Sequence, residues 1–323
     1  MFFWGTNAAG KTSVLEAVSI IANPIAANWL VTLSQWREIS PPSQANDDAL
    51  RVLFCDLDVA HSPRFEFTIG GKPYSLLIEA ITTGTIVNPG SVTESATSSP
   101  MATEPQTELR GVKLIYHQPG KDPVESPLNL IEQGFQTPPP VAAERLGAFH
   151  IHARRATSPG ETARLLTSLY ETKRENELLD LLKKVDPRII RMWPGIRKSG
   201  PTVFLDIGLT RSLPMNVLGD GFCRVVLMAT GLLWTSGQLL IVDEIDSGLH
   251  HSIMRSVWKG IAGIAGEKQI FCATHNEEML RATLAAFEQH QDWLRIFRLD
   301  RHEDGTLTAQ KYTYETFRIS DQA

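Results

Sequence analysis

The sequence has few cysteines and no long apolar run, and each absence excludes a class of protein. Its 323 residues include 3 cysteines, Cys55, Cys223 and Cys272. They are far apart and form no C-x-x-C pair, so we expect reduced core thiols and neither a disulfide framework nor a cysteine metal site. No apolar run approaches the length of a membrane span, so we expect a cytoplasmic protein that does not enter a membrane.

An excess of positive charge is also absent. The formal net charge is −5 at pH 7, so no global basic field attracts nucleic acid, and a contact with DNA would need a local patch or a partner. Coiled-coil heptads are missing as well, which excludes a long-armed protein. Hydrophobic residues make up 42% of the chain, enough for one large α/β domain or a domain with an appended lobe.

A glycine-rich turn near the start is the first informative stretch. Gly5, Gly10, Lys11 and Thr12 fit G-x-x-x-x-G-K-[ST] between an apolar stretch and a helical pattern. Glycines allow successive N–H groups to turn toward a phosphate at the positive end of a helix. Lys11 would neutralise phosphate charge, and the Thr12 hydroxyl would hold Mg²⁺. The predicted phosphate loop consists of Gly5, Thr6, Asn7, Ala8, Ala9, Gly10, Lys11, Thr12 and Ser13. The alternative is a glycine-rich turn that only caps a helix.

Hydrophobic periodicity predicts two helices and an antiparallel β lobe in the first half. The helices span residues 12–21 and 26–39. The lobe, over residues 50–118, contains the strands predicted at 51–58, 64–69, 74–81 and 109–117, with a hairpin turn at Gly70-Gly71. Residues 82–107 are rich in Thr, Ser, Pro and Gly and are predicted to form a flexible loop. The proline-punctuated residues 119–140 are predicted to be irregular surface.

Helices and strands alternate in the second half. Leucine spacing predicts a helical insertion over residues 160–186, with a helical pair at 165–182. Beyond residue 200 the predicted strands are 202–209, 238–242, 269–273, 294–299 and 307–314, and the predicted helices are 219–234, 249–264 and 277–289. Such alternation builds a mostly parallel sheet covered on both faces. We predict one α/β phosphate-loop domain over residues 1–323.

The second informative stretch is an acidic pair after an apolar run. Leu239, Leu240, Ile241 and Val242 predict a buried strand, and Asp243 and Glu244 follow at its C-terminal end, where ligands bind in open α/β sheets. Asp243 would take Mg²⁺ through its water shell, and Glu244 would orient and deprotonate the attacking water. The alternative is an ordinary strand end with a helix cap.

These motifs resemble a known group of proteins. Asp243-Glu244 is followed by Ile245-Asp246-Ser247-Gly248-Leu249-His250, with Leu218-Gly219-Asp220-Gly221 upstream and Ala273-Thr274-His275-Asn276 downstream. The set resembles the ABC-type ATPase heads of the RecF, SMC and overcoming-lysogenisation-defect branch of AAA ATPases. The resemblance implies a phosphate-loop NTPase that binds ATP and Mg²⁺.

The resemblance also implies roles for the flanking motifs. Gly219, Asp220 and Gly221 match the signature loop, which in this family contacts the γ-phosphate held by the opposite subunit; a Gly-x-Gly that opens a helix is itself an anion-binding N-terminus. Asp246 and Ser247 match the segment that crosses the dimer interface. His275 matches the switch histidine at a strand end, against the alternative of a satisfied structural residue.

Some features depart from the family. Only Met1 to Trp4 precede Gly5, so either the chain is truncated at its start or the sheet contains a stub strand. Gln44 and Gln118 are both candidates for the glutamine loop. No nuclease domain follows the last predicted strand, so a nuclease would be a separate chain. One basic cluster contains titratable histidines and consists of His150, His152, Arg154 and Arg155. It is predicted either to contact phosphate or a partner, or to be only the polar end of a strand.

The sequence therefore predicts an Mg²⁺-dependent ATPase that dimerises head to tail. Lys11, Glu244 and His275 would act in catalysis, Thr12 and Asp243 would hold Mg²⁺, and Gly219 to Gly221 would complete the site of the opposite subunit. The resemblance implies that the dimer gates a nuclease or other effector in DNA transactions or phage defence. Two alternatives stay open: a nucleotide-binding scaffold without turnover, and a RecF-like repair ATPase, which salt-dependent binding of duplex DNA would favour.

Overall fold

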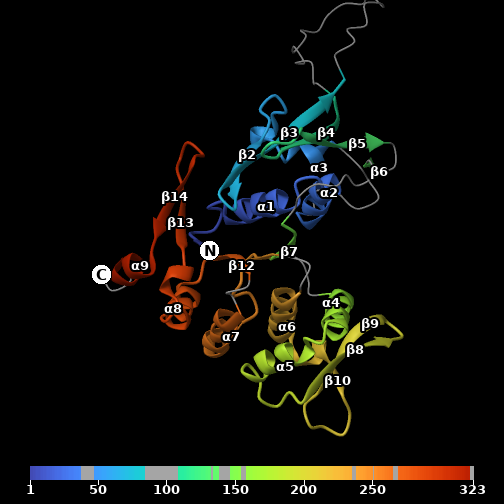
Figure 1. The fold of residues 1–323 in the computed structure, drawn as a ribbon, viewed down its shortest axis with the longest axis vertical. Helices are drawn as coiled ribbons and strands as arrows, with labels where there is room; N and C mark the ends of the chain where they lie inside the picture. Colours follow the sequence, from blue (N-terminus) through green and yellow to red (C-terminus); the bar gives the residue numbers. More distant parts are fainter. Residues whose placement is uncertain are drawn as a thin grey trace, which may run out of the picture. The chain divides into compact units, whose positions relative to one another are not determined.

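The apolar residues ahead of the glycine-rich turn form a short strand at the centre of a sheet. In the computed structural model, β1 (Phe2–Trp4) pairs in parallel with β12 (Gln269–Thr274) on one side and with β13 (Ile296–Arg301) on the other (Figure 1). The three residues of β1 thus form a strand of the sheet, and its end delivers the glycine-rich turn to the carboxyl edge of the sheet.

Six strands make up this sheet, in the order β14-β13-β1-β12-β11-β7. All neighbours are parallel except the pair formed by β13 and β14. The remaining bounds are β7 Ala148–Ile151, β11 Leu239–Val242 and β14 Leu307–Tyr312. The predicted α/β fold with a mostly parallel sheet is confirmed.

Both faces of the sheet are apolar because alternate residues of each strand point to opposite sides. Phe2 and Val242 belong to the large core that includes α6–α8, whereas Phe3 and Ile241 pack in a smaller cluster with residues of α1. Figure 1 shows α1 on one face and α6, α7 and α8 on the other. The bounds of the helices are α1 Lys11–Ala22, α6 Asp220–Leu233, α7 His251–Ile264, α8 Glu277–Ala286 and α9 Tyr314–Ser320.

The predicted helical pair is present next to α6. It consists of α4 (Pro159–Glu171), capped by the Ser158 side chain, and α5 (Glu175–Lys183). A small antiparallel sheet of β8 (Arg191–Arg197), β9 (Gly200–Asp206) and β10 (Leu213–Pro214) follows. Arg174, between the two helices, donates from Nη1 to the Leu233 carbonyl at 3.0 Å, which ties the pair to the C-terminal end of α6.

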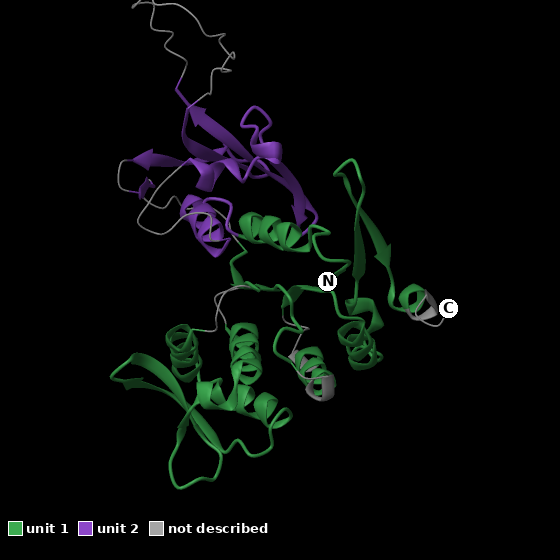
Figure 2. Cartoon of the chain, turned by 180° about the vertical axis from the view of Figure 1, so that it is seen from behind, with its two compact units in different colours: residues 1–22, 146–323 green, residues 23–145 purple. Residues whose placement is uncertain are grey.

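A second antiparallel sheet lies in a separate unit of the chain. Residues 1–22 and 146–323 form the first unit, and residues 23–145 form the second (Figure 2). The second unit contains α2 Ala27–Trp36, α3 Asp48–Arg51, β2 Arg64–Ile69, β3 Lys72–Thr82, β4 Leu109–His117, β5 Val124–Ile131 and β6 Gly134–Gln136. Strands at 64–69 and 109–117 are confirmed, and the strand predicted at 74–81 lies inside β3. That all 323 residues form one ATPase domain stays a prediction.

The strand predicted at 51–58 is wrong. The preceding residues form α3, in which the Asp47 carboxylate accepts a hydrogen bond from Arg51 at 2.8 Å, four residues later. A 3₁₀ turn follows, with Asp56 and Leu57 at positive φ. An i,i+4 acidic–basic pair favours a helix, and left-handed residues cannot continue a strand.

The irregular surface predicted at 119–140 is also wrong, because the segment contains β5 and β6. Pro127 lies opposite Lys113 of β4, whereas β6 pairs only with residues 129–131. Among the described residues, none pairs with the outer side of β5 at Pro127, where a missing N–H costs no ladder bond. Prolines therefore did not exclude a strand here.

The structure describes residues 1–37, 47–83, 108–131, 134–137, 146–153, 158–234, 238–249, 251–264 and 268–320. Residues 84–107 of the predicted flexible loop lie outside these ranges. Cys223 and Cys272 are buried, and burial raises the pKa of the Cys272 thiol to about 12, but Cys55 is exposed, which corrects the expectation of three core thiols. Among the described residues, none of the helices has both the length and the apolar character needed to span a membrane.

Candidate functional site

The glycine-rich turn connects β1 to α1 in a conformation that requires its glycines. Gly5 has φ +158° and Gly10 has φ +80°. A Cβ at Gly5 would lie 2.4 Å from the Leu299 carbonyl oxygen, and one at Gly10 would lie 2.6 Å from a methyl group of Leu307. Strands β13 and β14 therefore pack directly on the turn, and only glycine fits at Gly5.

Lys11 points back over the turn. Its side chain is buried, and Nζ donates to the carbonyl oxygens of Gly5 at 2.8 Å and Thr6 at 2.7 Å. Burial lowers the pKa of Lys11, while the nearby carboxylates, with Asp243 the largest contributor, act in the opposite direction. The ammonium thus lies inside the loop that the sequence predicts to hold phosphate.

The loop and the acidic pair meet at one hydrogen bond. The Thr12 hydroxyl donates to Asp243 Oδ2 at 2.8 Å, across 231 positions of the sequence. Asp243 is only 2% exposed, and its N–H donates to the Ile151 carbonyl of β7 at 2.9 Å. Burial raises the pKa of Asp243, and the hydrogen bonds from the Thr12 hydroxyl and the Glu244 N–H partly oppose this. Two hard oxygen ligands thus lie side by side where the sequence predicts Mg²⁺.

The other two predicted catalytic residues lie at the same edge of the sheet. Glu244 follows Asp243 directly and is half-buried. His275 is exposed and follows β12, whose last residue, Thr274, pairs with Trp4 of β1. Gly5 follows Trp4 and His275 follows Thr274, so the phosphate loop and His275 begin side by side at the carboxyl ends of two neighbouring parallel strands.

The residues on both sides of His275 make hydrogen bonds, and one of these bonds reaches the segment after β11. The Thr274 hydroxyl donates to Asp246 Oδ1 at 2.5 Å and accepts from the Asn276 N–H at 3.0 Å. Asn276 in turn caps α8, accepting from the Glu278 N–H at 2.9 Å. The residues before and after His275 are therefore both anchored.

The predicted signature loop opens α6 and is exposed at its first two residues. Gly219 has φ +94°, and Gly219 and Asp220 are both exposed. Within the described part of the chain, no hydrogen bond or ion pair joins Gly219–Gly221 to the phosphate loop. Gly221 instead packs on Gly248, where a Cβ at Gly221 would meet the Gly248 carbonyl oxygen at 2.0 Å.

Sequence reasoning missed one residue of this region, Arg224 of α6. Its guanidinium is buried and donates from Nη2 to the carbonyl oxygens of Asp243 at 2.5 Å and Glu244 at 3.1 Å. A signal was available, because Arg224 is the only charge between Cys223 and Trp234, and a charge on a buried helix face must find polar partners.

The histidines of the predicted basic cluster are buried. His150, in β7, is 4% exposed, and His152 is 2% exposed. His152 Nε2 lies 3.9 Å from Oε1 of Glu16, a buried residue of α1. The two arginines of the cluster lie outside the described residues, so the choice between a phosphate contact and a polar strand end stays open.

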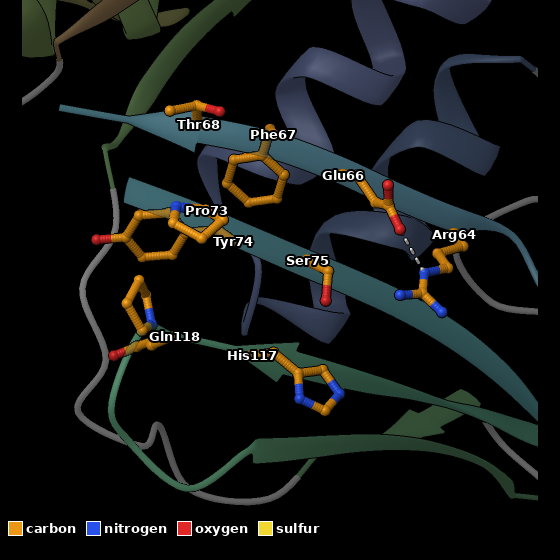
Figure 3. Close-up of a pocket in the computed structure, with 10 residues that line it drawn as sticks. Arg64, Glu66, Phe67, Thr68, Pro73, Tyr74, Ser75, His117 and Gln118 are labelled. Atoms are coloured by element: carbon orange, nitrogen blue, oxygen red, sulfur yellow. Dashed lines mark ion pairs between the residues drawn. The ribbon is translucent and has the colours of Figure 1, made fainter. Parts of the chain in front are cut away.

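Gln118, one of two candidates for the glutamine loop, lies in the second unit. It lines an open pocket of about 550 Å³ on the β2–β4 side of the sheet, with Phe67, Tyr74 and His117 among its neighbours (Figure 3). The other candidate, Gln44, lies outside the described residues. Which glutamine serves that role stays a prediction.

Parts of the chain are similar to known proteins. Residues 137–281 match the model of the family described as “AAA domain, putative AbiEii toxin, Type IV TA system”. This range contains the predicted signature loop, acidic pair and switch histidine, but not the phosphate loop. A 77-residue stretch is 26% identical to an ATP/GTP phosphatase of Helicobacter pylori and covers 22% of this chain and 21% of that protein. The match thus spans about a fifth of the relative's length.

Two solved structures that are partly similar to this chain are SMC head domains. One is an Smc head bound to the C-winged helix domain of ScpA, with TM-score 0.49 and 12% identity over 98% of this chain and 91% of the other. Another is the SMC head domain from Thermotoga maritima, with TM-score 0.41 and 11% identity over 96% and 89%. The family match agrees with the resemblance found in the sequence: residues 137–281, which include the acidic pair, are similar to an AAA domain.

Proposed function

We propose that this protein hydrolyses ATP with Mg²⁺ and that it works as a head-to-tail dimer around two nucleotides. The hydrogen bond between Thr12 and Asp243 carries the proposal, because it brings a phosphate-binding loop and a buried carboxylate together at the carboxyl edge of the sheet. Helix and strand ends at that edge are where phosphoryl-transfer sites form.

The residues present fit a magnesium-bound nucleotide. Gly5 and Gly10 leave the two ends of the turn without a Cβ atom, and Thr12 and Asp243 offer two oxygen ligands. Magnesium keeps several waters and binds through one or two protein ligands, so these two oxygens are enough for it. When bound, Mg²⁺ would neutralise phosphate charge.

Each residue then has a defined task in the proposed reaction. Lys11 would bind phosphate oxygens through the ammonium that now bonds the Gly5 and Thr6 carbonyls. Glu244 would orient a water and accept its proton, and His275 would contact the terminal phosphate. Gly219 to Gly221, exposed at the start of α6, would bind the phosphate held by a second copy. We propose that closure of this composite site drives a nuclease or other effector subunit, in DNA transactions or defence against phage.

The test is a comparison of three proteins. Glu244→Gln should bind ATP, dimerise with nucleotide and release phosphate at least about 100-fold more slowly than the wild type. Lys11→Ala should lose both binding and turnover. Retained turnover in Glu244→Gln would remove that residue from its role. Binding without phosphate release by the wild type would make the protein a nucleotide-gated scaffold and not an enzyme.

A further inference from the structure

The backbone of the acidic pair adopts an unusual conformation. Glu244 has φ +45°, in the left-handed region that residues with a Cβ rarely enter. Strain of this kind persists only where surrounding contacts hold it, and it concentrates at functional sites. The contacts that hold Glu244 are therefore part of how its carboxylate is aimed.

Arg224 makes two of those contacts. One guanidinium nitrogen, Nη2, donates to the Asp243 and Glu244 carbonyl oxygens, on both sides of the strained residue. Asp243, Glu244 and Asp246 lie near enough to oppose the lowering of the Arg224 pKa by burial. No ion pair joins Arg224 to a carboxylate within the described residues. The hydrogen bonds of its guanidinium go to backbone carbonyl oxygens.

A second contact joins the same two segments. Gly221, one turn before Arg224, lies so close to Gly248 that a Cβ would overlap the Gly248 carbonyl oxygen. Within the loop, the Glu244 carbonyl oxygen also accepts from the Ser247 N–H at 2.9 Å. The start of α6 thus contacts both the beginning and the end of the segment 243–248. Arg224 and Ser247 both donate to the Glu244 carbonyl oxygen.

We propose that Arg224 is a positioning residue: it holds the peptide of Asp243 and Glu244 in the left-handed turn that aims the Glu244 carboxylate. Its effect on turnover rests on the proposed function, but its effect on the backbone does not. Removal of the guanidinium should free the turn to relax, so the carboxylate would lose its alignment while the phosphate loop keeps its own contacts.

The experiment compares Arg224→Met and Arg224→Lys with a matched control, Arg174→Met. The control removes another arginine–carbonyl bond to the same helix, at Leu233 near its C-terminal end. Amide hydrogen exchange is measured over residues 239–249, followed by kcat, KM and the Kd for ATP. Exchange reports the Ser247 amide, which bonds the same oxygen as Arg224.

We expect Arg224→Met to speed exchange in this segment at least about tenfold and to lower kcat about 10- to 100-fold, with KM and Kd within about threefold. Arg224→Lys should recover part of both, and Arg174→Met should change neither. Unchanged exchange in Arg224→Met, or an equal effect in Arg174→Met, would overturn the proposal. If Arg224→Met does not fold, Arg224→Lys must still show faster exchange than the wild type.

The two proposals fail separately. If the wild-type protein releases no phosphate from ATP, the proposed function is wrong. Amide hydrogen exchange over residues 239–249 would still decide whether Arg224 holds the turn. Conversely, an active wild type with the same exchange in all variants keeps the ATPase and removes Arg224 from it.

Discussion

The site of the first unit and the five-stranded sheet of the second use buried residues in opposite ways. In the sheet, Phe67, Tyr74 and Tyr116 stack across three strands with ring centroids 5.8–6.4 Å apart. In the site, the buried groups are charged, with Lys11 at 9% and Asp243 at 2% exposure. Burial of aromatic surface stabilises a fold, whereas burial of charge costs free energy. The aromatic stack of the sheet should therefore raise the free energy of unfolding, whereas the buried charges of the site should lower it.

The strongest test of this contrast is Tyr116→Ala in the sheet. Tyr116 is 1% exposed and stacks on two other rings, so its truncation should lower the free energy of unfolding by about 3–5 kcal/mol. Urea unfolding followed by circular dichroism measures the loss. A loss below about 1 kcal/mol would show that the ring stack does not stabilise the sheet.

Gly5→Ala tests the strained turn of the site. The new methyl would overlap the Leu299 carbonyl at an unfavourable φ, so we expect a loss of about 2–4 kcal/mol in unfolding free energy and of ATP binding. Gly305→Ala is the control, because Gly305 has φ +84° with no atom within 4 Å of its Cβ position. It should cost only about 1–2 kcal/mol. Equal losses would mean that the contact with Leu299 is unimportant.

Asp243→Asn tests whether the site costs stability. Burial raises the pKa of Asp243 in the folded state, so the carboxyl group favours folding below its unfolded pKa, and this contribution is lost as pH rises through the folded pKa. The variant should therefore melt at a higher temperature than the wild type at about pH 8, and the difference should shrink toward about pH 4.

Differential scanning calorimetry across this pH range checks the prediction. Asp300→Asn, which changes an exposed carboxylate of β13, should leave the melting temperature unchanged at both ends. A lower melting temperature for Asp243→Asn at about pH 8 would contradict the idea that the site gives up stability. Loss of magnesium-dependent ATP binding is expected in either case.

The smallest effect is expected for Lys113→Ala on the surface of the sheet. Lys113 Nζ lies 3.5 Å from Glu79 and 3.3 Å from Glu125, both exposed. Solvent screens such pairs, so the free energy of unfolding should change by less than about 1 kcal/mol. A larger change in urea unfolding would mean that surface charge, and not only the aromatic stack, stabilises this sheet.

The parts of the fold that sequence predicted best are those with a local cause. The phosphate-loop spacing places glycines where the backbone needs them, and the run of four apolar residues before Asp243 is a buried strand. The segment 51–58 was mispredicted because its β-prone residues lie beside Asp47, whose pairing with Arg51 favours a helix. Local pairing there overrides propensity.

Sequence predicted only those residues of the site that belong to recognisable motifs. That Thr12 and Asp243 meet follows from strand order, because the turn after β1 and the end of β11 both lie at the carboxyl edge of one mostly parallel sheet. Arg224 was not predicted: a lone charge in an apolar helix signals that it needs polar partners, but the sequence does not identify its acceptors, which are backbone oxygens 19 and 20 positions away. The left-handed turn at Glu244 was missed for a related reason: no glycine marks it.

His275 is fastened by its neighbours, and this limits how it can respond to a nucleotide. Thr274 ends a paired strand and Asn276 starts a capped helix, so the main chain between them has little freedom. Any response must then be a rotation of the imidazole about its own side-chain bonds, which in an exposed residue takes picoseconds to nanoseconds. The ring would act as a fast local probe of the terminal phosphate, and its carbon and nitrogen resonances would record occupancy without a loop closing over it.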